Sequence, residues 1–408
     1  MIIEITGAGF ANKGAQLMLA TVCQKLRDTA PDIQLCIPMD HHAHEDRAQY
    51  GLYFTLRAPE HSIGLRRLGR DILNNIVGRT RLSRAYGLIR EQEVDGLIDI
   101  SGYAFGDKWP ASKTRRLLKP AAVYKRVGKP VVMLPQMLGP FTKPGQADAF
   151  RRLANHLDLI FAREQESFDH ARPLVDTGKL RLAPDITIPT PPKPLPKAAT
   201  RYACIVPNSK LLEGNPQQQN WAGDYLPRLA LACRHIVAKG LEVRIVQHEY
   251  DSGDTQLVKE LQQRVQIGSC KVVQESDPQV LKAVLGAAEL VIGSRFHSLV
   301  STLSMGVPAI ALGWAHKYDA LLRDFGTPEM MHYAASPVEH LIELIDRALD
   351  ARDALVVALT DNKRRLVQQV EEMWLEVFDT LGIPASNSRQ VAESLEDEAR
   401  ELSEVTPR

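Results

Sequence analysis

The sequence predicts an α/β protein of two domains, each built around a mainly parallel β-sheet. Short apolar runs alternate with helical stretches along most of the chain, which is typical of strands joined by crossover helices. The chain has 408 residues, more than one hydrophobic core usually serves. A proline-rich stretch at 187–200, TIPTPPKPLPKAAT, has the extended and stiff character expected of a domain linker.

The first domain is predicted to span residues 1–188, and the linker residues 189–200. The domain opens with a strand at 2–6, a loop that contains glycines, and a helix near 15–29. Further apolar strands, separated by helical stretches, are predicted at 33–38, 96–100, 130–135 and 158–163.

The second domain, predicted at 201–352, repeats this alternation. Its strands are predicted at 201–208, 241–249, 271–276, 289–293 and 308–313. A long helix at 353–383 is expected to pack back on the domains, and the acidic tail at 384–408 to be loosely ordered. Two Rossmann-like, doubly wound domains that face a central cleft form a GT-B-like architecture, in which the active site lies between the domains.

The composition excludes several classes of protein. The 50 Lys and Arg residues balance 49 Asp and Glu residues, so the basic excess that nucleic-acid binding requires is missing. No apolar run reaches the roughly 18 residues of a membrane span, and the N-terminus MIIEITGAGF lacks the features of a signal peptide. Five scattered cysteines without a CxxC spacing favour a reducing cytoplasm over a disulfide framework or a zinc site. We therefore expect a cytoplasmic protein with no bound metal.

Basic residues follow two successive predicted strands of the second domain. Arg295 and His297 come directly after one strand, and Lys317 comes after the next. Adjacent parallel strands bring their carboxyl ends together, so these side chains are expected to converge. An arginine at such a turn can bind a phosphate or carboxylate, and a histidine there can donate a proton near neutral pH. The alternative is an ordinary loop in which these residues cap the helix or form local ion pairs.

Three other stretches leave alternatives open. The loop GAGFANKG suggests dinucleotide binding, but Asn12 stands where the G-x-G-x-x-G fingerprint needs a glycine. Asn12 either hydrogen-bonds a sugar hydroxyl or caps the following helix. The stretch DHHAHED at 40–46 has metal-ligand residue types, but its spacing matches no helix-face pair and favours a solvated loop. His248, at a predicted strand end, either reaches the cleft, where it contacts the donor or orients His297, or lies on the surface.

A series of motifs runs along the chain in a fixed order. These are NKGAQLML (12–19), LPQMLGPF (134–141), FAREQESFDHAR (161–172), APDIT (183–187), and RFH (295–297) with a later GVP and Lys317. Together they resemble the signatures of the polysaccharide pyruvyl transferase family, and the resemblance spans residues 1–330. Ala15 departs from that pattern, because most family members have an acidic residue after the Asn-x-Gly loop.

The resemblance implies an enzyme that moves a pyruvyl group from phosphoenolpyruvate onto two hydroxyls of a sugar, forming a ketal. The sugar would belong to a polysaccharide or to its lipid-linked precursor. The resemblance implies His297 as the general acid that protonates the donor. It implies Arg163, Arg295 and Lys317 as cations for the donor's phosphate and carboxylate, and we count Ser294 in the same turn with them. Phosphoenolpyruvate would be a co-substrate, and no cofactor is implied.

A further set of residues is assigned to acceptor binding or to support of the site. They are Asn12, Gln136, His248 and Trp314, of which Trp314, like Trp109, either stacks on a sugar ring or lies in the core.

Two other functions remain as alternatives. The first is a GT-B glycosyltransferase with a nucleotide-sugar donor, in which Glu275 or Asp277 would bind the ribose hydroxyls. The second is a degenerate family member that only binds a glycan or a partner protein.

The stretch at 57–90 holds eight arginines and two acidic residues. Within it, residues 64–84 place apolar side chains near one helical face. This segment either contacts an anionic membrane surface at its inner face, as an enzyme of lipid-linked sugars would, or packs into its own domain with a solvated face.

Overall fold

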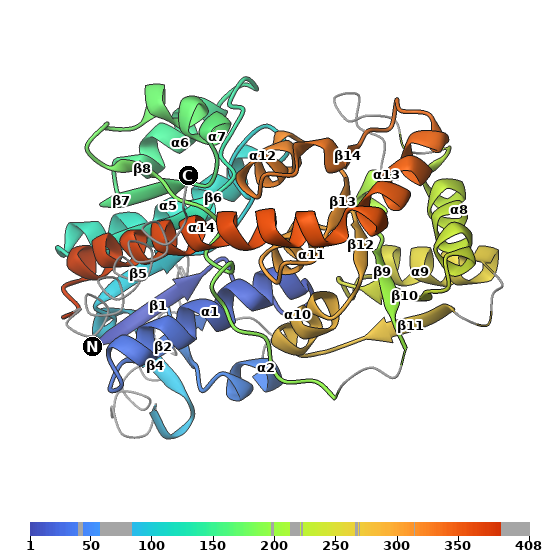
Figure 1. The fold of residues 1–408 in the computed structure, drawn as a ribbon. Coiled ribbons are helices and arrows are strands. Elements are labelled where there is room, and N and C mark those ends of the chain that lie inside the picture. Colours follow the sequence, from blue (N-terminus) through green and yellow to red (C-terminus); the bar gives the residue numbers. More distant parts are fainter. Residues whose placement is uncertain are drawn as a thin grey trace, which may run out of the picture.

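The computed structural model describes residues 1–39, 44–57, 84–196, 200–212, 221, 223–265, 268, 270–313 and 315–384. Within these residues the chain forms two α/β domains, and a long C-terminal helix lies across both of them (Figure 1). Each domain contains one parallel sheet flanked by helices. The predicted fold class, two doubly wound domains, is therefore confirmed.

The N-terminal sheet has eight parallel strands in the order β4-β3-β2-β1-β5-β6-β7-β8. They are β1 (Ile2–Thr6), β2 (Gln34–Pro38), β3 (Tyr53–Leu56), β4 (Leu88–Arg90), β5 (Gly96–Asp99), β6 (Val131–Gln136), β7 (Leu159–Ala162) and β8 (Leu180–Leu182). The central strands are buried apolar runs because helices cover both faces of a parallel sheet. Strands β3, β4 and β8 are not among the predicted ones, since runs this short show no clear period.

Helices flank the N-terminal sheet, and a side-chain cap marks the start of the first one. They are α1 (Lys13–Thr29), α2 (His44–Gln49), α5 (Ala111–Arg126), α6 (Gln146–Ala154) and α7 (Gln165–Ala171). Helix α1 starts after Asn12, whose side-chain oxygen accepts hydrogen bonds from the N–H groups of Gly14 (2.9 Å) and Ala15 (3.2 Å). Of the two roles considered for Asn12, the structure thus shows helix capping.

The C-terminal sheet has six parallel strands in the order β11-β10-β9-β12-β13-β14. They are β9 (Tyr202–Val206), β10 (Glu242–Gln247), β11 (Cys270–Gln274), β12 (Leu290–Gly293), β13 (Ala309–Leu312) and β14 (Met331–His332). The accompanying helices are α8 (Tyr225–Ala238), α9 (Ser252–Val265), α10 (Pro278–Gly286), α11 (Phe296–Leu303), α12 (His316–Asp324) and α13 (Val338–Asp350).

The long helix α14 (Arg352–Leu381) belongs to the cores of both domains. Its first half contributes Leu355, Leu359 and Leu366 to the apolar core of the C-terminal domain. Its second half places Trp374 and Phe378 in the core of the N-terminal domain. Because burial of each large apolar side chain stabilises a fold by about 1.5–3 kcal/mol, this helix ties the two domains together.

The domains also meet directly beside the start of α1. The N–H of Lys13 donates to the carbonyl of His248 (3.1 Å), and the N–H of Tyr250 donates to the carbonyl of Ala11 (3.0 Å). The buried Lys13 ammonium donates to the carbonyl of Ser276 (2.9 Å). The loop after β1 is thus fixed to the loop after β10.

Several predicted features lie outside the described residues. These are residues 40–43 of the loop predicted at 40–46, the arginine-rich segment at 58–83, Trp314 and the tail at 385–408. The rest of that predicted loop, residues 44–46, is not a loop but begins helix α2. Residues 187–190, at the start of the proline-rich stretch, are largely buried between the domains. In the part of the chain that the structure describes, none of the helices has both the length and the apolar character needed to cross a membrane.

Candidate active site

The strand order of each sheet reverses at one point, between β1 and β5 in the first sheet and between β9 and β12 in the second. A cavity of about 460 Å³ lies where the loops after these four strands meet. Its walls include Asn12 and Tyr103 from the N-terminal domain, and Asn208 and Arg295 from the C-terminal domain. Open α/β sheets bind ligands at such switch points, so this cavity is the candidate active site.

His297 lies in the first turn of α11, in the wall of this cavity. Its Nε2 atom is 3.3 Å from a carboxylate oxygen of Asp185, and the ring packs edge-on against Phe296. On the other side the ring lies so close to Gly14 that a β-carbon at position 14 would overlap it. The imidazole is therefore held between the two domains.

Asp185 is a buried carboxylate that joins three parts of the chain. One of its oxygens accepts hydrogen bonds from the N–H (2.9 Å) and the hydroxyl (2.6 Å) of Thr187. The other oxygen accepts from Arg163 (3.1 Å) and faces His297. Burial on its own would raise the pKa of Asp185, but the charges of His297 and Arg163 and the Thr187 hydrogen bonds hold it well below its usual value.

Arg163 follows β7 and reaches the cavity from the N-terminal domain. Its guanidinium carbon lies 3.9 Å from the centre of the Phe296 ring, a stacking contact that arginine makes well. Asp185 binds one edge of the Arg163 guanidinium and the Phe296 ring packs on its face. These two contacts hold the guanidinium beside α11 of the C-terminal domain.

Lys317, in the first turn of α12, is buried in the same cavity. Its ammonium lies 4.9 Å from the centre of the Tyr103 ring and 5.3 Å from that of Phe296. Burial lowers the pKa of Lys317 well below its usual value, the charges of Arg163 and Lys108 add to this, and Glu164 opposes it. An anionic ligand in the cavity would favour the charged form of this lysine.

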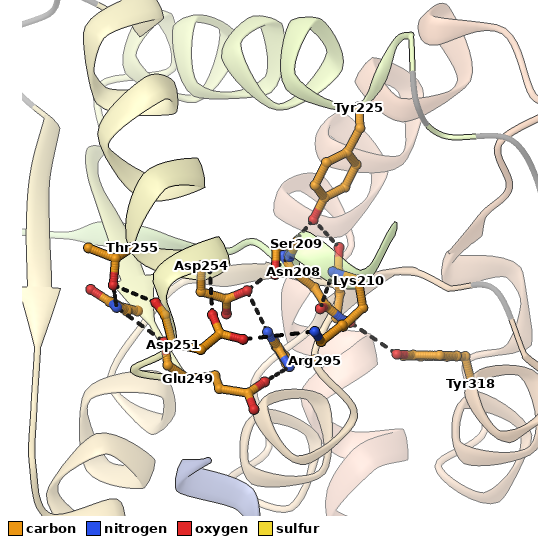
Figure 2. A network of polar contacts seen from close by, with 12 residues as sticks. Asn208, Ser209, Lys210, Tyr225, Glu249, Asp251, Asp254, Thr255, Arg295 and Tyr318 are labelled. Atoms are coloured by element: carbon orange, nitrogen blue, oxygen red, sulfur yellow. Dashed lines mark hydrogen bonds and ion pairs between the residues drawn. The ribbon is translucent and has the colours of Figure 1, made fainter. Parts of the chain in front are cut away.

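Arg295 is already paired within its own domain. Figure 2 shows its guanidinium between the carboxylates of Glu249 and Asp254. The Asp254 oxygen lies 2.5 Å from the nearer nitrogen and also accepts from the N–H of Ser209 (2.9 Å). Arg295 lines the cavity, as expected for a residue that binds the donor. However, its guanidinium already binds two carboxylates, and these would compete with an anionic ligand.

His248 is buried at the end of β10, in the cavity wall. The surface alternative for this residue is therefore wrong. Burial, and next the charges of Arg295 and His297, lower the pKa of His248 well below its usual value. Its Nδ1 atom has no hydrogen-bond partner among the described residues. A neutral imidazole next to His297 can accept or donate a hydrogen bond without adding charge.

Gln136 lies below the cavity, not in its wall. Its side-chain N–H donates to Asp99, which in turn accepts from the hydroxyl of Ser101 (2.8 Å) in the wall. Burial raises the pKa of Asp99 to about 6, and the hydrogen bonds from Gln136 and Ser101 oppose this rise. Of the two roles assigned to Gln136, the structure supports the indirect one.

The loop after β5 forms an aromatic wall on the N-terminal side of the cavity. Tyr103 and Trp109 both line it, and the indole N–H of Trp109 donates to the carbonyl of Tyr103 (2.8 Å). The ammonium of Lys113 lies 4.1 Å from the Trp109 ring centre. Trp109 is only partly buried, so the alternative of a core role is wrong for it.

Other predicted residues lie away from the cavity. Ser294 is buried, and its hydroxyl accepts from Tyr225 (2.7 Å), so the structure shows it supporting the turn before Arg295. Asp277 caps α10 and pairs with Lys193.

His316 lies outside the central cavity and pairs with Glu164 (3.1 Å) across the domain boundary. Sequence reasoning did not assign Asp185, Tyr103 or Lys108 to the site. Asp185 could have been found from the APDIT motif, in which it is a charged residue between the apolar residues Pro184 and Ile186.

The comparison with known families settles what kind of protein this is. A family model described as polysaccharide pyruvyl transferase matches residues 12–316. The chain belongs to the polysaccharide pyruvyl transferase family. Membership makes it an enzyme of pyruvyl transfer in polysaccharide biosynthesis. It is also 23% identical over 313 residues to the amylovoran biosynthesis protein AmsJ of Erwinia amylovora, a match that covers 68% of each chain.

Solved structures with a similar fold have far lower identity. The UDP-GlcNAc 2-epimerase of Neisseria meningitidis superposes with a TM-score of 0.54 at 11% identity, covering 91% of this chain and 100% of that one. The HepE protein of Anabaena, solved with UDP and glucose, gives a TM-score of 0.53 at 15% identity, covering 97% and 100%. For this family member these likenesses show the fold, two parallel-sheet domains around a cleft.

Proposed function

We propose that the enzyme transfers the pyruvyl group of phosphoenolpyruvate to two hydroxyls of one sugar, with His297 as general acid. The observation that carries the proposal is the meeting of Arg163, Lys317 and His297 in one cavity between the domains. Phosphoenolpyruvate carries a phosphate and a carboxylate, and two cations from opposite walls match two anionic groups on one small molecule.

The buried Lys317 supports an anionic donor in particular. A lysine held largely without solvent gains more from an anion than an exposed one does, because no water screens the pair. The Arg163 guanidinium is fixed by Asp185 and Phe296, so it is oriented before the donor arrives. Both features favour binding of a compact, highly charged molecule.

The proposed reaction needs one acid and two hydroxyl groups. The His297 imidazolium gives its proton to C3 of phosphoenolpyruvate, which leaves positive charge at C2. A sugar hydroxyl adds to C2, the bond between C2 and the phosphate oxygen breaks, and a second hydroxyl closes the ketal. Of the two hydroxyl protons, one returns to His297 and the other leaves with the phosphate.

The aromatic wall supports an acceptor site on the N-terminal side. Tyr103 and Trp109 offer ring faces beside the cavity, and the polar edge of Ser101 lies next to them. Sugars bind to such walls through their apolar C–H faces while their hydroxyls meet polar groups. The acceptor would be a hexose of a polysaccharide or of its lipid-linked precursor.

The nucleotide-sugar alternative finds less support. The carboxylate Asp277, suggested for the ribose hydroxyls, caps a helix and pairs with Lys193, and Glu275 accepts from the N–H of Asp277 (2.9 Å). Neither lines the central cavity. Glu249 does line it, but it is neutralised by Arg295.

A transfer assay tests the proposal. The enzyme is incubated with phosphoenolpyruvate and a panel of hexosides, and products are analysed by mass spectrometry and carbon NMR. We expect one hexoside to gain the mass of pyruvate less water, with a quaternary ketal carbon, and to lose this product with His297→Gln. Transfer of a glycosyl group from a nucleotide sugar instead would contradict the proposal.

A further inference from the structure

We infer that Asp185 is a positioning residue that fixes the orientation and the tautomer of the His297 imidazole. The inference rests on the proposed role of His297 as general acid. It gives a role to Asp185, which lies in the APDIT motif but received no role from the resemblance. It makes the acid a unit of three side chains, Arg163, Asp185 and His297, drawn from both domains and the segment between them.

Contacts other than the one with His297 fix the position of the Asp185 carboxylate. Asp185 lies just after β8, and the two hydrogen bonds from Thr187 fix one of its oxygens. The buried ammonium of Lys282, on α10, donates to the carbonyls of Thr187 (2.8 Å) and Ile188 (3.3 Å). The segment that carries Asp185 is thus attached to the C-terminal domain as well as to Arg163 of the N-terminal domain.

The second oxygen of Asp185 selects one nitrogen of the imidazole. Nε2 of His297 lies 3.3 Å from it, while Nδ1 is the ring nitrogen nearest to Gly14. A carboxylate beside Nε2 favours the tautomer in which Nε2 carries the proton when the ring is neutral. The exchangeable proton of the acid is then the one on Nδ1.

Asp185 is the carboxylate that stands at the His297 ring. The basic residues Arg163, His248, Arg295 and Lys317 line the same cavity. The other nearby carboxylates are already engaged, Glu249 and Asp254 by Arg295, and Glu164 by His316. Asp185 is therefore the carboxylate placed to hold an N–H of this imidazole.

The interaction must act in both directions. The charge of His297 is the largest influence that lowers the pKa of Asp185 against the effect of burial. The carboxylate is thus kept ionised beside the ring, where it is an acceptor for the N–H at Nε2. Loss of the carboxylate should release the imidazole from this orientation and tautomer.

Nuclear magnetic resonance on the protein without substrate tests this directly. The full-length enzyme is labelled with ¹⁵N-histidine, and the His297 signal is assigned by its absence from His297→Gln. In Asp185→Asn we expect the neutral His297 ring to lose its preference for a proton on Nε2, seen in the two ring ¹⁵N shifts. Thr187→Val, which removes a hydrogen bond from the same carboxylate but no charge, should keep the proton on Nε2.

Two results would overturn the inference. One is an unchanged tautomer of His297 in a folded Asp185→Asn protein. The other needs no variant of Asp185 and so remains available if that variant does not fold: at alkaline pH, the parent protein would show the proton on Nδ1. We expect it on Nε2.

The outcome is separable from that of the proposed function. If the tautomer is as expected but no pyruvyl transfer is found, the proposed function fails and the pairing stands. If transfer is found while Asp185→Asn leaves the tautomer unchanged, the pairing fails alone. In an active enzyme, Asp185→Asn should lower kcat more than it raises KM for phosphoenolpyruvate.

Discussion

Gly14 of the N-terminal domain lies in contact with the imidazole of His297 in the C-terminal domain. A β-carbon at position 14 would overlap the ring, and the backbone of Gly14 has an ordinary conformation that any residue can adopt. The glycine is therefore required by the neighbouring domain, not by the turn in which it stands. The Asn-x-Gly loop and the Arg-x-His motif, far apart in the sequence, are two sides of one contact.

Gly14→Ala should push His297 out of place while the fold remains. A displacement of about 1 Å in a catalytic group can cost on the order of a hundredfold in rate, so we expect a loss of that size in kcat. Steady-state kinetics measures it. Gly9→Ala is the matched control, because the nearest atom to a β-carbon there is the Ala15 methyl at 3.8 Å. Equal activity losses in the two variants would contradict the contact.

Lys317 should take up a proton when the donor binds. Its pKa is lowered by burial and by nearby cations, so the bound anion shifts it toward the ammonium form. Titration calorimetry at pH 8 in buffers of different ionisation enthalpy should show net proton uptake with phosphoenolpyruvate. The uptake should vanish in Lys317→Met. Proton uptake that persists in this variant would assign the effect to another group.

Removal of Arg295 should damage the fold as well as the site. Arg295→Met leaves the buried Asp254 without its cation, and breaking a buried pair in this way costs about 3–5 kcal/mol. Part of this loss should return in the double variant with Asp254→Asn, as measured by urea unfolding. Simple addition of the two single effects would argue against the pairing. An Arg295 variant can therefore lose donor binding because the fold is disturbed, without any direct contact between Arg295 and the donor.

Trp109 should act on the acceptor and not on the donor. Aromatic contacts of this kind are worth about 0.5–1.5 kcal/mol, so Trp109→Ala should raise KM for the sugar about two- to tenfold. Trp109→Phe keeps a ring and should lie closer to the parent. If KM for phosphoenolpyruvate rises instead, the aromatic wall belongs to the donor site.

The convergence of the cations could be predicted because it follows from a general rule. Strand ends of a parallel sheet meet at one edge, and this rule predicts from the sequence that Arg295, His297 and Lys317 lie together. The helix-capping role of Asn12 was also predictable as one of two alternatives, because it depends on residues next to it in the chain.

The pairing of these side chains could not be predicted. Arg295 finds Glu249 and Asp254 on a neighbouring strand end and helix, and His297 finds Asp185 on the segment between the domains. The contact of His297 depends on how the two domains meet, and those of Arg295 depend on how distant segments pack within one domain, and no periodicity or spacing in one sequence specifies either. The packing within the C-terminal domain also explains why Ser294, next to Arg295, contacts Tyr225.

The identity of the donor is the central claim, and ligand-dependent thermal stability tests it most directly. Phosphoenolpyruvate and a set of UDP and GDP sugars are compared on the parent protein and on Lys317→Met. A ligand at a hundred times its Kd should stabilise the parent by about 2.7 kcal/mol. We expect stabilisation by phosphoenolpyruvate alone, lost in Lys317→Met. Stabilisation by a nucleotide sugar, with none by phosphoenolpyruvate, would contradict the account.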